Sequence, residues 1–188
     1  MRRDIVWELI GQKGLEHLAL EIGADRIVAD GVVVTDFGEG SFRLDYRVVC
    51  DGSWDLRSAE LSLERGGGQH RIQIRRGETG EWTVDGKPRP DFAGCAFIDI
   101  RATPFTNTLP IRRLRLAPDE RRVLRVVYVP IPELELSAAE QAYTRLDASE
   151  PPHRFRYHGI VGNFQAELAV DADGIVIDYP PFWRRRAG

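Results

Sequence analysis

The chain has 188 residues, of which 43% are hydrophobic and 29% charged, an ordinary balance for a soluble globular protein with a substantial core. Its net charge of −3 and pI of about 5.9 argue against a nucleic-acid partner, because nucleic-acid-binding domains are normally basic. No apolar run approaches the roughly 20 residues of a membrane helix, and the first eight residues lack the apolar core of a signal peptide. We therefore expect a cytoplasmic protein without a transmembrane segment.

Alternation of apolar and polar residues dominates the first half of the chain. Residues 43–50, 59–64 and 71–75 alternate in this way, which is typical of half-buried strands. The Asp85-Gly86 pair follows the strand-like residues 82–84 and predicts a tight hairpin turn. This half of the chain therefore indicates several short strands joined by turns.

A helix-compatible segment interrupts this pattern near the middle of the chain. Thr106 or Asn107 can accept hydrogen bonds from the free amides of a first helical turn, and Pro110 is tolerated only near a helix start. The segment predicts one short helix, capped by Thr106 or Asn107. Leu109 and Leu114 should then contact the inner face of a sheet.

Strand patterning returns after this segment. Residues 123–129 are apolar on both faces and predict a strand covered on both sides. Residues 164–170 and 175–179 flank an Asp-Ala-Asp-Gly turn and predict a hairpin. Residues 137–146 fit either a helix with a Ser-x-x-Glu capping box or a strand opposite residues 154–157, and we favour the strand.

Many short strands with one helix indicate a mainly β fold. A sheet of this size must curl to hide its edges, so we expect a strongly curved antiparallel sheet, open like an unclosed barrel, wrapped around a single short α-helix. Neither a linker nor an internal repeat divides the chain, and residues 1–188 are expected to form one domain. Such a sheet can leave a cavity where it does not meet the helix.

The sequence carries no motif for catalysis, metal binding or a cofactor. The four histidines are scattered, and Cys50 and Cys95 lie in strand-like patterns without neighbouring ligands. We expect no metal, no cofactor and two buried, reduced thiols. Asp99, beside the helical segment, either forms an ion pair, caps helix amides, or serves as a ligand-binding or catalytic carboxylate.

Aromatic and charged residues supply the candidate ligand site. Aromatic residues on sheet faces are usually core, but those that line a cavity bind lipid chains or stack on sugars. Arginine can meet an anionic head group, although most arginines are solvated. The candidate ligand-binding residues are Arg47, Trp54, Trp82, Asp99, Arg112, Tyr128 and Tyr143.

Several segments together carry a family resemblance. The most specific is the string Thr103-Pro104-Phe105-Thr106-Asn107-Thr108-Leu109-Pro110-Ile111-Arg112-Arg113-Leu114, and the others are residues 14–18, 46–54, 82–86, 94–95, 141–143 and 170–180. They resemble the "putative glycolipid-binding" family of bacterial proteins, long regarded as a domain of unknown function. The resemblance implies a spiral β-roll around a single helix, a homodimer, a remote likeness to periplasmic lipoprotein carriers and a glycolipid-like ligand.

We therefore expect a non-enzymatic binding protein for a lipid, glycolipid or other amphipathic ligand, held between the sheet and the helix. One alternative is an enzyme on a β scaffold that uses Asp99 with a nearby Arg or His as an acid–base pair. Another is a structural or interaction protein without a ligand. Apolar cavity walls would favour the first function, converging carboxylates the second and a filled interior the third.

Overall fold

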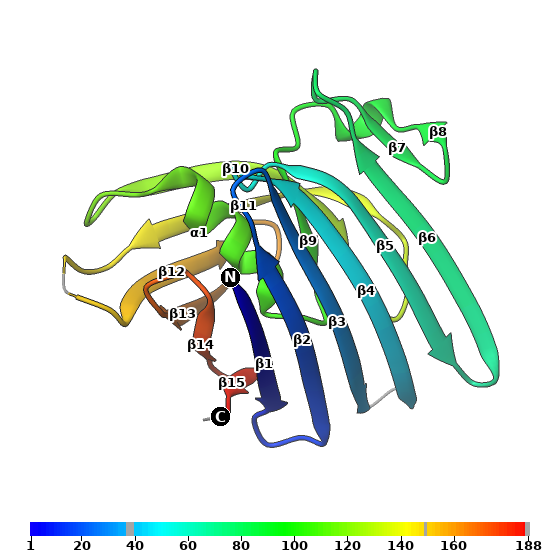
Figure 1. Cartoon of the computed structure of the whole chain (residues 1–188), viewed down its shortest axis with the longest axis horizontal. Coiled ribbons are helices and arrows are strands. Elements are labelled where there is room, and N and C mark those ends of the chain that lie inside the picture. Colours follow the sequence, from blue (N-terminus) through cyan, green and yellow to red (C-terminus); the bar gives the residue numbers. More distant parts are fainter. Residues whose placement is uncertain (37–39, 149, 187–188) are drawn as a thin grey trace. The chain divides into compact units, whose positions relative to one another are not determined.

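The structure, a computed structural model, describes residues 1–36, 40–148 and 150–186 (Figure 1). The described residues form two compact units: unit 1 contains residues 1–93 and residue 186, and unit 2 contains residues 94–185. Strands dominate both units, and α1 (Thr108–Leu114) is the only α-helix in the described part of the chain. The prediction of a mainly β fold with a single short helix is confirmed.

Unit 1 contains eight strands, and each pairs antiparallel with the next strand in the chain. They are β1 (Arg2–Leu9), β2 (Gly14–Ile22), β3 (Arg26–Asp36), β4 (Ser41–Asp51), β5 (Leu56–Arg65), β6 (Gly68–Arg76), β7 (Trp82–Val84) and β8 (Lys87–Pro88). A short 3₁₀ helix, η1 (Pro90–Phe92), follows β8. Strands β2 to β6 are long and curved, and β8 forms an edge of the sheet, so the sheet does not close there (Figure 1).

One face of the unit 1 sheet is apolar because its register aligns apolar residues across strands. Leu18, Gly31, Tyr46 and Leu61 lie opposite one another on four adjacent strands. The Tyr46 ring covers Gly31, where an added Cβ would lie only 2.1 Å from the ring Cζ, so the position requires glycine. The Tyr46 hydroxyl donates a hydrogen bond of 2.5 Å to the buried Glu16 carboxylate. This face is the core of unit 1.

The opposite face of the unit 1 sheet carries polar side chains that pair across strands. Arg47 on β4 forms an ion pair of 2.7 Å with Asp30 on β3. Gln73 on β6 donates a hydrogen bond of 3.0 Å to Glu60 on β5. Both pairs are exposed, as the alternation of apolar and polar residues predicts.

The predicted Asp85-Gly86 turn joins β7 to β8. Asp85 and Gly86 have φ angles of 50° and 75°, the left-handed conformation that a tight hairpin turn needs. Trp82, just before this turn, is 2% exposed and packs edge-on against Phe92 of η1. Trp54 is 5% exposed. Both tryptophans are therefore core residues of unit 1.

Unit 2 contains seven strands and both remaining helical segments. The strands are β9 (Phe97–Ile100), β10 (Arg121–Val129), β11 (Ser137–Arg145), β12 (His153–Gly159), β13 (Phe164–Val170), β14 (Val176–Tyr179) and β15 (Trp183–Arg185), and their order in the sheet is β15-β14-β13-β12-β11-β10-β9. A 3₁₀ helix, η2 (Phe105–Asn107), runs directly into α1 between β9 and β10. Strand β9 forms an edge of this sheet, which does not close there either.

The pairing of β9 with β10 is the one departure, among the described strands within each unit, from the expected antiparallel sheet. These two strands are parallel, with Asp99 opposite Tyr128. Parallel neighbours need a long connection that returns the chain to the starting end of the first strand. The segment that contains η2 and α1 provides this connection. The helical insert is therefore what allows β9 and β10 to pair in parallel.

The predicted helix is present, but its predicted cap is wrong. Asn107 occupies the N-cap position with φ −64° and ψ −26°, already helical, because η2 continues into α1, and its side chain caps no amide. It accepts a hydrogen bond of 2.7 Å from the Tyr143 hydroxyl on β11. The Thr106 hydroxyl likewise contacts Asp99 on β9, at 3.4 Å. These side chains fix the insert on the sheet instead of capping the helix.

The two leucines of the helix differ in burial. Leu109 is 0% exposed, whereas Leu114 is only half-buried, so the predicted contact of Leu114 with the sheet can bury only part of its side chain. Five residues along an α-helix advance the side chain by about 140° beyond one full turn, so the two leucines cannot share a face. Leu116 is buried instead, after the chain turns at Arg115 with φ 48°.

Residues 137–145 are a strand, as favoured from the sequence. Strand β11 pairs with β10 and β12, and Tyr143 lies opposite Tyr157. The predicted hairpin of β13 and β14 is also confirmed. Val126 and Val127 on β10 are buried on opposite faces, but Val123 is 51% exposed, so only part of this strand is covered on both sides as predicted.

Both cysteines are buried, Cys50 in unit 1 and Cys95 in unit 2. Burial raises the pKa of the Cys50 thiol to about 12, so this thiol is protonated at neutral pH and a poor nucleophile. No helix among the described residues is long and apolar enough to span a bilayer.

Candidate functional site

Asp99 lies on the inner face of the unit 2 sheet, where polar and aromatic side chains from several strands meet. The register places Tyr128 of β10 opposite Asp99, and Tyr143 of β11 opposite Tyr157 of β12. Gln141 is two residues before Tyr143 on β11, so its side chain points to the same face. The curved sheet and η2 therefore bring one carboxylate, one amide and several hydroxyls together.

Uncharged donors hold the Asp99 carboxylate. The Gln141 amide nitrogen donates to Oδ2 in a short hydrogen bond, and the Thr106 hydroxyl donates to Oδ1 at 3.4 Å. The Tyr157 hydroxyl donates a third hydrogen bond. None of these donors carries a charge, so none of them would compensate the negative charge of an ionised Asp99.

Four tyrosines surround this carboxylate, and we call Tyr128, Tyr143, Tyr157 and Tyr179 the tyrosine cluster. Burial raises the pKa of each of the four hydroxyls, and the negative charge of Asp99 raises it further. All four therefore stay protonated and uncharged at neutral pH. Four of the five tyrosines in the chain belong to this cluster.

Burial also raises the pKa of Asp99, because the charged form is poorly solvated there. The hydrogen bonds from Gln141, Thr106 and Tyr157 oppose this effect without cancelling it. A carboxyl group with a raised pKa, beside groups that could bind a ligand, is typical of a functional site, although structural networks also produce such shifts.

Two hydroxyls of the tyrosine cluster have unused hydrogen-bonding capacity. Tyr143 donates to Asn107 and Tyr157 donates to Asp99. Tyr128 and Tyr179 are half-buried, and within residues 1–36, 40–148 and 150–186 no group forms a hydrogen bond with either hydroxyl. Asp99 is also half-buried. Each of the three residues therefore keeps part of its surface accessible to solvent.

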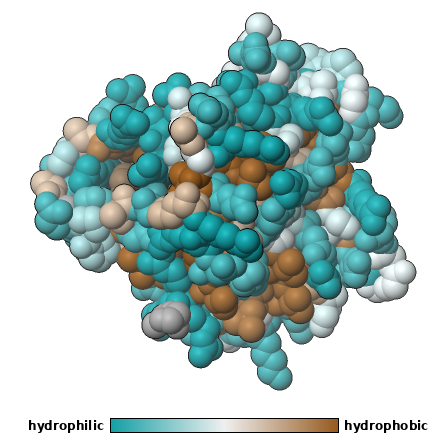
Figure 2. Space-filling view, in the orientation of Figure 1, coloured by the Kyte–Doolittle hydropathy of each residue, from teal (hydrophilic) through white to brown (hydrophobic). Residues whose placement is uncertain are grey.

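An aromatic strip extends from the cluster to the surface, formed by the rings of Tyr157, Phe164, Tyr179 and Phe182. Tyr157 lies 6.1 Å from Phe164 and 6.3 Å from Tyr179 between ring centroids. Phe182 lies 5.4 Å from Phe164 and 5.5 Å from Tyr179, and it is 39% exposed. Figure 2 shows that hydrophobic patches interrupt a mainly hydrophilic surface on the face in view. Polar groups at one end and apolar rings at the other give this site an amphipathic character.

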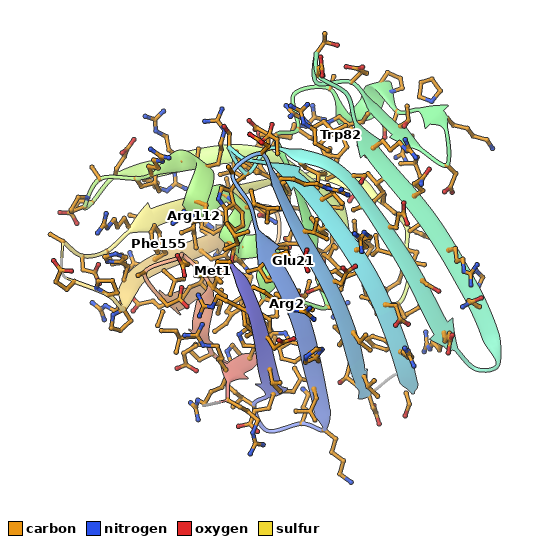
Figure 3. All side chains as sticks on the ribbon, in the orientation of Figure 1. Met1, Arg2, Glu21, Trp82, Arg112 and Phe155 are labelled. Atoms are coloured by element: carbon orange, nitrogen blue, oxygen red, sulfur yellow. The ribbon has the colours of Figure 1, made fainter. Side chains whose placement is uncertain are left out.

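The sequence-predicted ligand residues fall into two groups. Asp99, Tyr128 and Tyr143 lie together in unit 2. Arg112, also in unit 2, is half-buried on α1, where its Cδ would lie 2.9 Å from a Cβ added at Gly174 in the β13–β14 turn (Figure 3).

The other three predicted residues belong to unit 1. Arg47 forms an ion pair with Asp30 on the exposed sheet face, and Trp54 is buried in the core. Trp82, labelled in Figure 3, is also buried there. Their surroundings support structural roles.

The sequence reasoning missed Gln141, Tyr157 and Tyr179 as members of the site. A signal existed for the first two, because the strand favoured at 137–146 was expected to pair with residues 154–157 and therefore place Gln141, Tyr143 and Tyr157 on one face. What was missing was the parallel pairing of β9, which brings Asp99 to that face. Tyr179 gave no comparable signal, because its place follows from a shift in register between β13 and β14.

Unit 1 has an open pocket of about 810 Å³ on its polar sheet face. Its lining includes Asp30, Arg47, Glu60 and Gln73, which satisfy one another across strands. These internal pairs leave less capacity for a ligand than the tyrosine cluster does. The unit 2 site is therefore the stronger candidate.

Comparison with known proteins gives consistent results. A search of curated proteins finds no match. Among solved structures, the crystal structure of a DUF1089 family protein from Pseudomonas aeruginosa matches with a TM-score of 0.78 and 38% sequence identity, over 91% of this chain and 92% of that chain. The family model described as "Putative glycolipid-binding" matches residues 4–185, which include both units. The chain belongs to this family.

Proposed function

We propose that the protein binds an amphipathic molecule through the Asp99 site of unit 2. The polar head group contacts Asp99, Tyr128 and Tyr179, and the apolar part lies along the aromatic strip towards Phe182. The observation that carries this proposal is that the half-buried residue Asp99 lies beside two tyrosines whose hydroxyls have no hydrogen-bond partner in the described chain. Membership of a family described as glycolipid-binding supports the same class of ligand.

Binding is better supported than acid–base catalysis at this site. An enzyme that used Asp99 with an arginine or histidine would place such a group beside the carboxylate. The hydrogen-bond partners of Asp99 are instead Gln141, Thr106 and Tyr157. These groups orient a carboxylate and supply no second acid or base at neutral pH.

A titration with dodecyl maltoside, kept below its micelle concentration, tests this proposal. Saturable binding is expected by calorimetry. Phe182→Ala should weaken it by about 5-fold to 30-fold, since the loss of one apolar contact is worth about 1–2 kcal/mol. Free maltose should show no effect of the Phe182 change, because it has no alkyl chain.

Arg47→Ala provides the matched control, since Arg47 lies on the exposed face of unit 1 in an ion pair with Asp30. Its affinity for dodecyl maltoside should equal that of the unmodified protein. Absence of saturable binding by dodecyl amphiphiles would overturn the proposed function.

The homodimer and the cytoplasmic location expected from the sequence stay predictions. Sedimentation velocity would show whether the protein is a homodimer, and cell fractionation would show whether it is cytoplasmic. We also propose that both units belong to a single folding domain, which the family match across both units supports.

A further inference from the structure

We propose that the exposed sheet face of unit 1 docks against the same face of a second copy of this chain, across strands β1 to β4. The surface uses residues of unit 1 only, so the inference does not depend on the proposed function. It assigns the place at which two copies meet, their orientation, and the side chains that they bring together.

An apolar pair marks this face. Leu15 on β2 and Val34 on β3 lie opposite each other and are 50% and 53% exposed. In the described part of the chain, they are the only exposed large apolar residues that face each other in the strand register. Val6 on β1 and Val32 on β3 point to the same side and are half-buried. An apolar patch with a polar rim is typical of a protein–protein interface.

Opposite charges flank this apolar pair. The register continues from Leu15 to Glu8 on β1, and from Val34 to Arg43 on β4. The row therefore runs acidic, apolar, apolar, basic across four adjacent strands (Figure 1). A row with this order of side chains can complement a second copy of itself.

A two-fold axis that runs parallel to the strands, between β2 and β3, produces this match. Such an axis reverses the order of the strands in the second copy, so β1 lies over β4 and β2 lies over β3. Because neighbouring strands are evenly spaced, at about 4.8 Å, β1 and β4 are equally far from the axis. Leu15 of each copy then contacts Val34 of the other. Glu8 of each copy likewise faces Arg43 of the other.

The charges also disfavour the other two-fold arrangement of the same faces. An axis perpendicular to the strands would place each strand over its own copy, so that Glu8 would face Glu8 and Arg43 would face Arg43. Like charges opposed across an interface are strongly unfavourable, whereas opposite charges fix its register. The row therefore favours the axis parallel to the strands.

Glu8 and Arg43 each keep a polar atom for the second copy. Arg43 donates from Nε and Nη2 to Asp45, which leaves Nη1 outside this pair. Glu8 accepts a hydrogen bond of 2.8 Å from Arg186 at Oε2, which leaves Oε1 outside that pair. A contact between Nη1 and Oε1 across the interface therefore adds to the existing pairs and does not replace them.

Sedimentation velocity over a range of protein concentrations tests the inference. The unmodified protein should show a reversible equilibrium between monomer and dimer. Val34→Glu should raise the dissociation constant of the dimer by at least about tenfold, because it places a carboxylate against Leu15 of the other copy. Val123→Glu is the matched control, since Val123 is 51% exposed on β10 of unit 2, and it should leave the equilibrium unchanged.

An exchange of charges tests the orientation. Glu8→Arg and Arg43→Glu should each weaken the dimer by about tenfold, because each change places like charges opposite one another. An equimolar mixture of the two variants should associate again, since a heterodimer has opposite charges at both contacts. The double variant, Glu8→Arg with Arg43→Glu, should form a homodimer for the same reason.

The outcomes decide the inference separately from the proposed function. A protein that is monomeric at every concentration overturns it, as does a dimer that Val34→Glu leaves intact or that Val123→Glu weakens equally. Failure of both the mixture and the double variant to associate also overturns it. Circular dichroism checks the fold of each variant, and the exchange of charges still decides if Val34→Glu does not fold. Binding of dodecyl maltoside stays an independent test of the Asp99 site.

Discussion

Units 1 and 2 are both built from successive strands, but they differ in where their polar side chains lie and in how these are paired. In unit 1 every strand pairs antiparallel with the next, and charged side chains meet their partners across strands on the exposed face. In unit 2 the helical insert forces one parallel pair and brings Thr106 and Asn107 onto the inner face. Unit 1 buries the Tyr46–Glu16 pair in its core, whereas in unit 2 the insert adds Thr106 and Asn107 to the polar groups on the inner face.

This contrast explains why the candidate site lies in unit 2. The polar groups of the insert require partners on the sheet, and Asp99 and Tyr143 provide them. The Asp99 carboxylate on that face in turn accepts a hydrogen bond from the neutral Gln141 amide. The chemistry of the site is therefore a consequence of how the insert is anchored.

The largest expected effect concerns the anchoring of the insert. Leu109→Ala should lower the free energy of unfolding by about 2–5 kcal/mol, because Leu109 is fully buried and its truncation leaves a cavity. Leu18→Ala, at a fully buried position in unit 1, should cost a similar amount. Urea denaturation measures both changes.

Leu114→Ala is the matched control in the same helix and should cost clearly less, since Leu114 is half-buried. An equal or larger loss would show that the insert is anchored differently. If the two units form one folding domain, all three variants will shift a single transition.

The next effect concerns the contact between the insert and β11. Tyr143→Phe should lower the free energy of unfolding by about 1–3 kcal/mol, because it leaves the buried Asn107 oxygen without its donor. Tyr128→Phe removes a hydroxyl that has no hydrogen bond within the described chain, so its change should stay within about 0.5 kcal/mol. Thermal denaturation of both variants measures the two losses. A larger loss in Tyr128→Phe than in Tyr143→Phe would contradict the hydrogen bonding seen in the structure.

A pH-dependent effect should distinguish Asp99 from an ordinary surface carboxylate. Burial raises the pKa of Asp99 in the folded protein above its unfolded value of about 3.9. Below about pH 4 the group is protonated in both states, and as pH rises the unfolded state loses the proton first. The stability of the unmodified protein relative to Asp99→Asn should therefore fall as pH rises through the folded-state pKa.

Urea denaturation of both proteins at intervals from pH 4 to pH 8 measures this difference. A stability difference that stays constant, or that grows in favour of the unmodified protein, would show that the hydrogen bonds from Gln141, Thr106 and Tyr157 outweigh burial.

The smallest effect is expected in unit 1. Arg47→Ala should change the free energy of unfolding by no more than about 1 kcal/mol, because the ion pair with Asp30 is exposed and screened by water and salt. Chemical denaturation checks this value. A loss of several kcal/mol would mean that the polar face of unit 1 contributes more to the fold than its exposure indicates.

The sequence predicted local structure better than it predicted the site. Alternation correctly indicated β4, β5, β6 and the β13–β14 hairpin, because each reflects one buried and one exposed face. It could not show that Asp99 lies opposite Tyr128, since parallel pairing depends on contacts across the whole insert. The caps expected at Thr106 and Asn107 failed for a related reason: local rules cannot show that a side chain has a partner on a distant strand.

The hydrogen bonds that anchor the insert also affect the order in which this region can form. The partners of Asp99–Gln141 and Asn107–Tyr143 are 42 and 36 residues apart in the chain. During synthesis from the N-terminus, Asp99 therefore stays in water until β11 and β12 have been made and have paired. Contacts between distant residues form slowly, since loop closure must precede them. The site should consequently be among the last parts of unit 2 to be assembled on the ribosome.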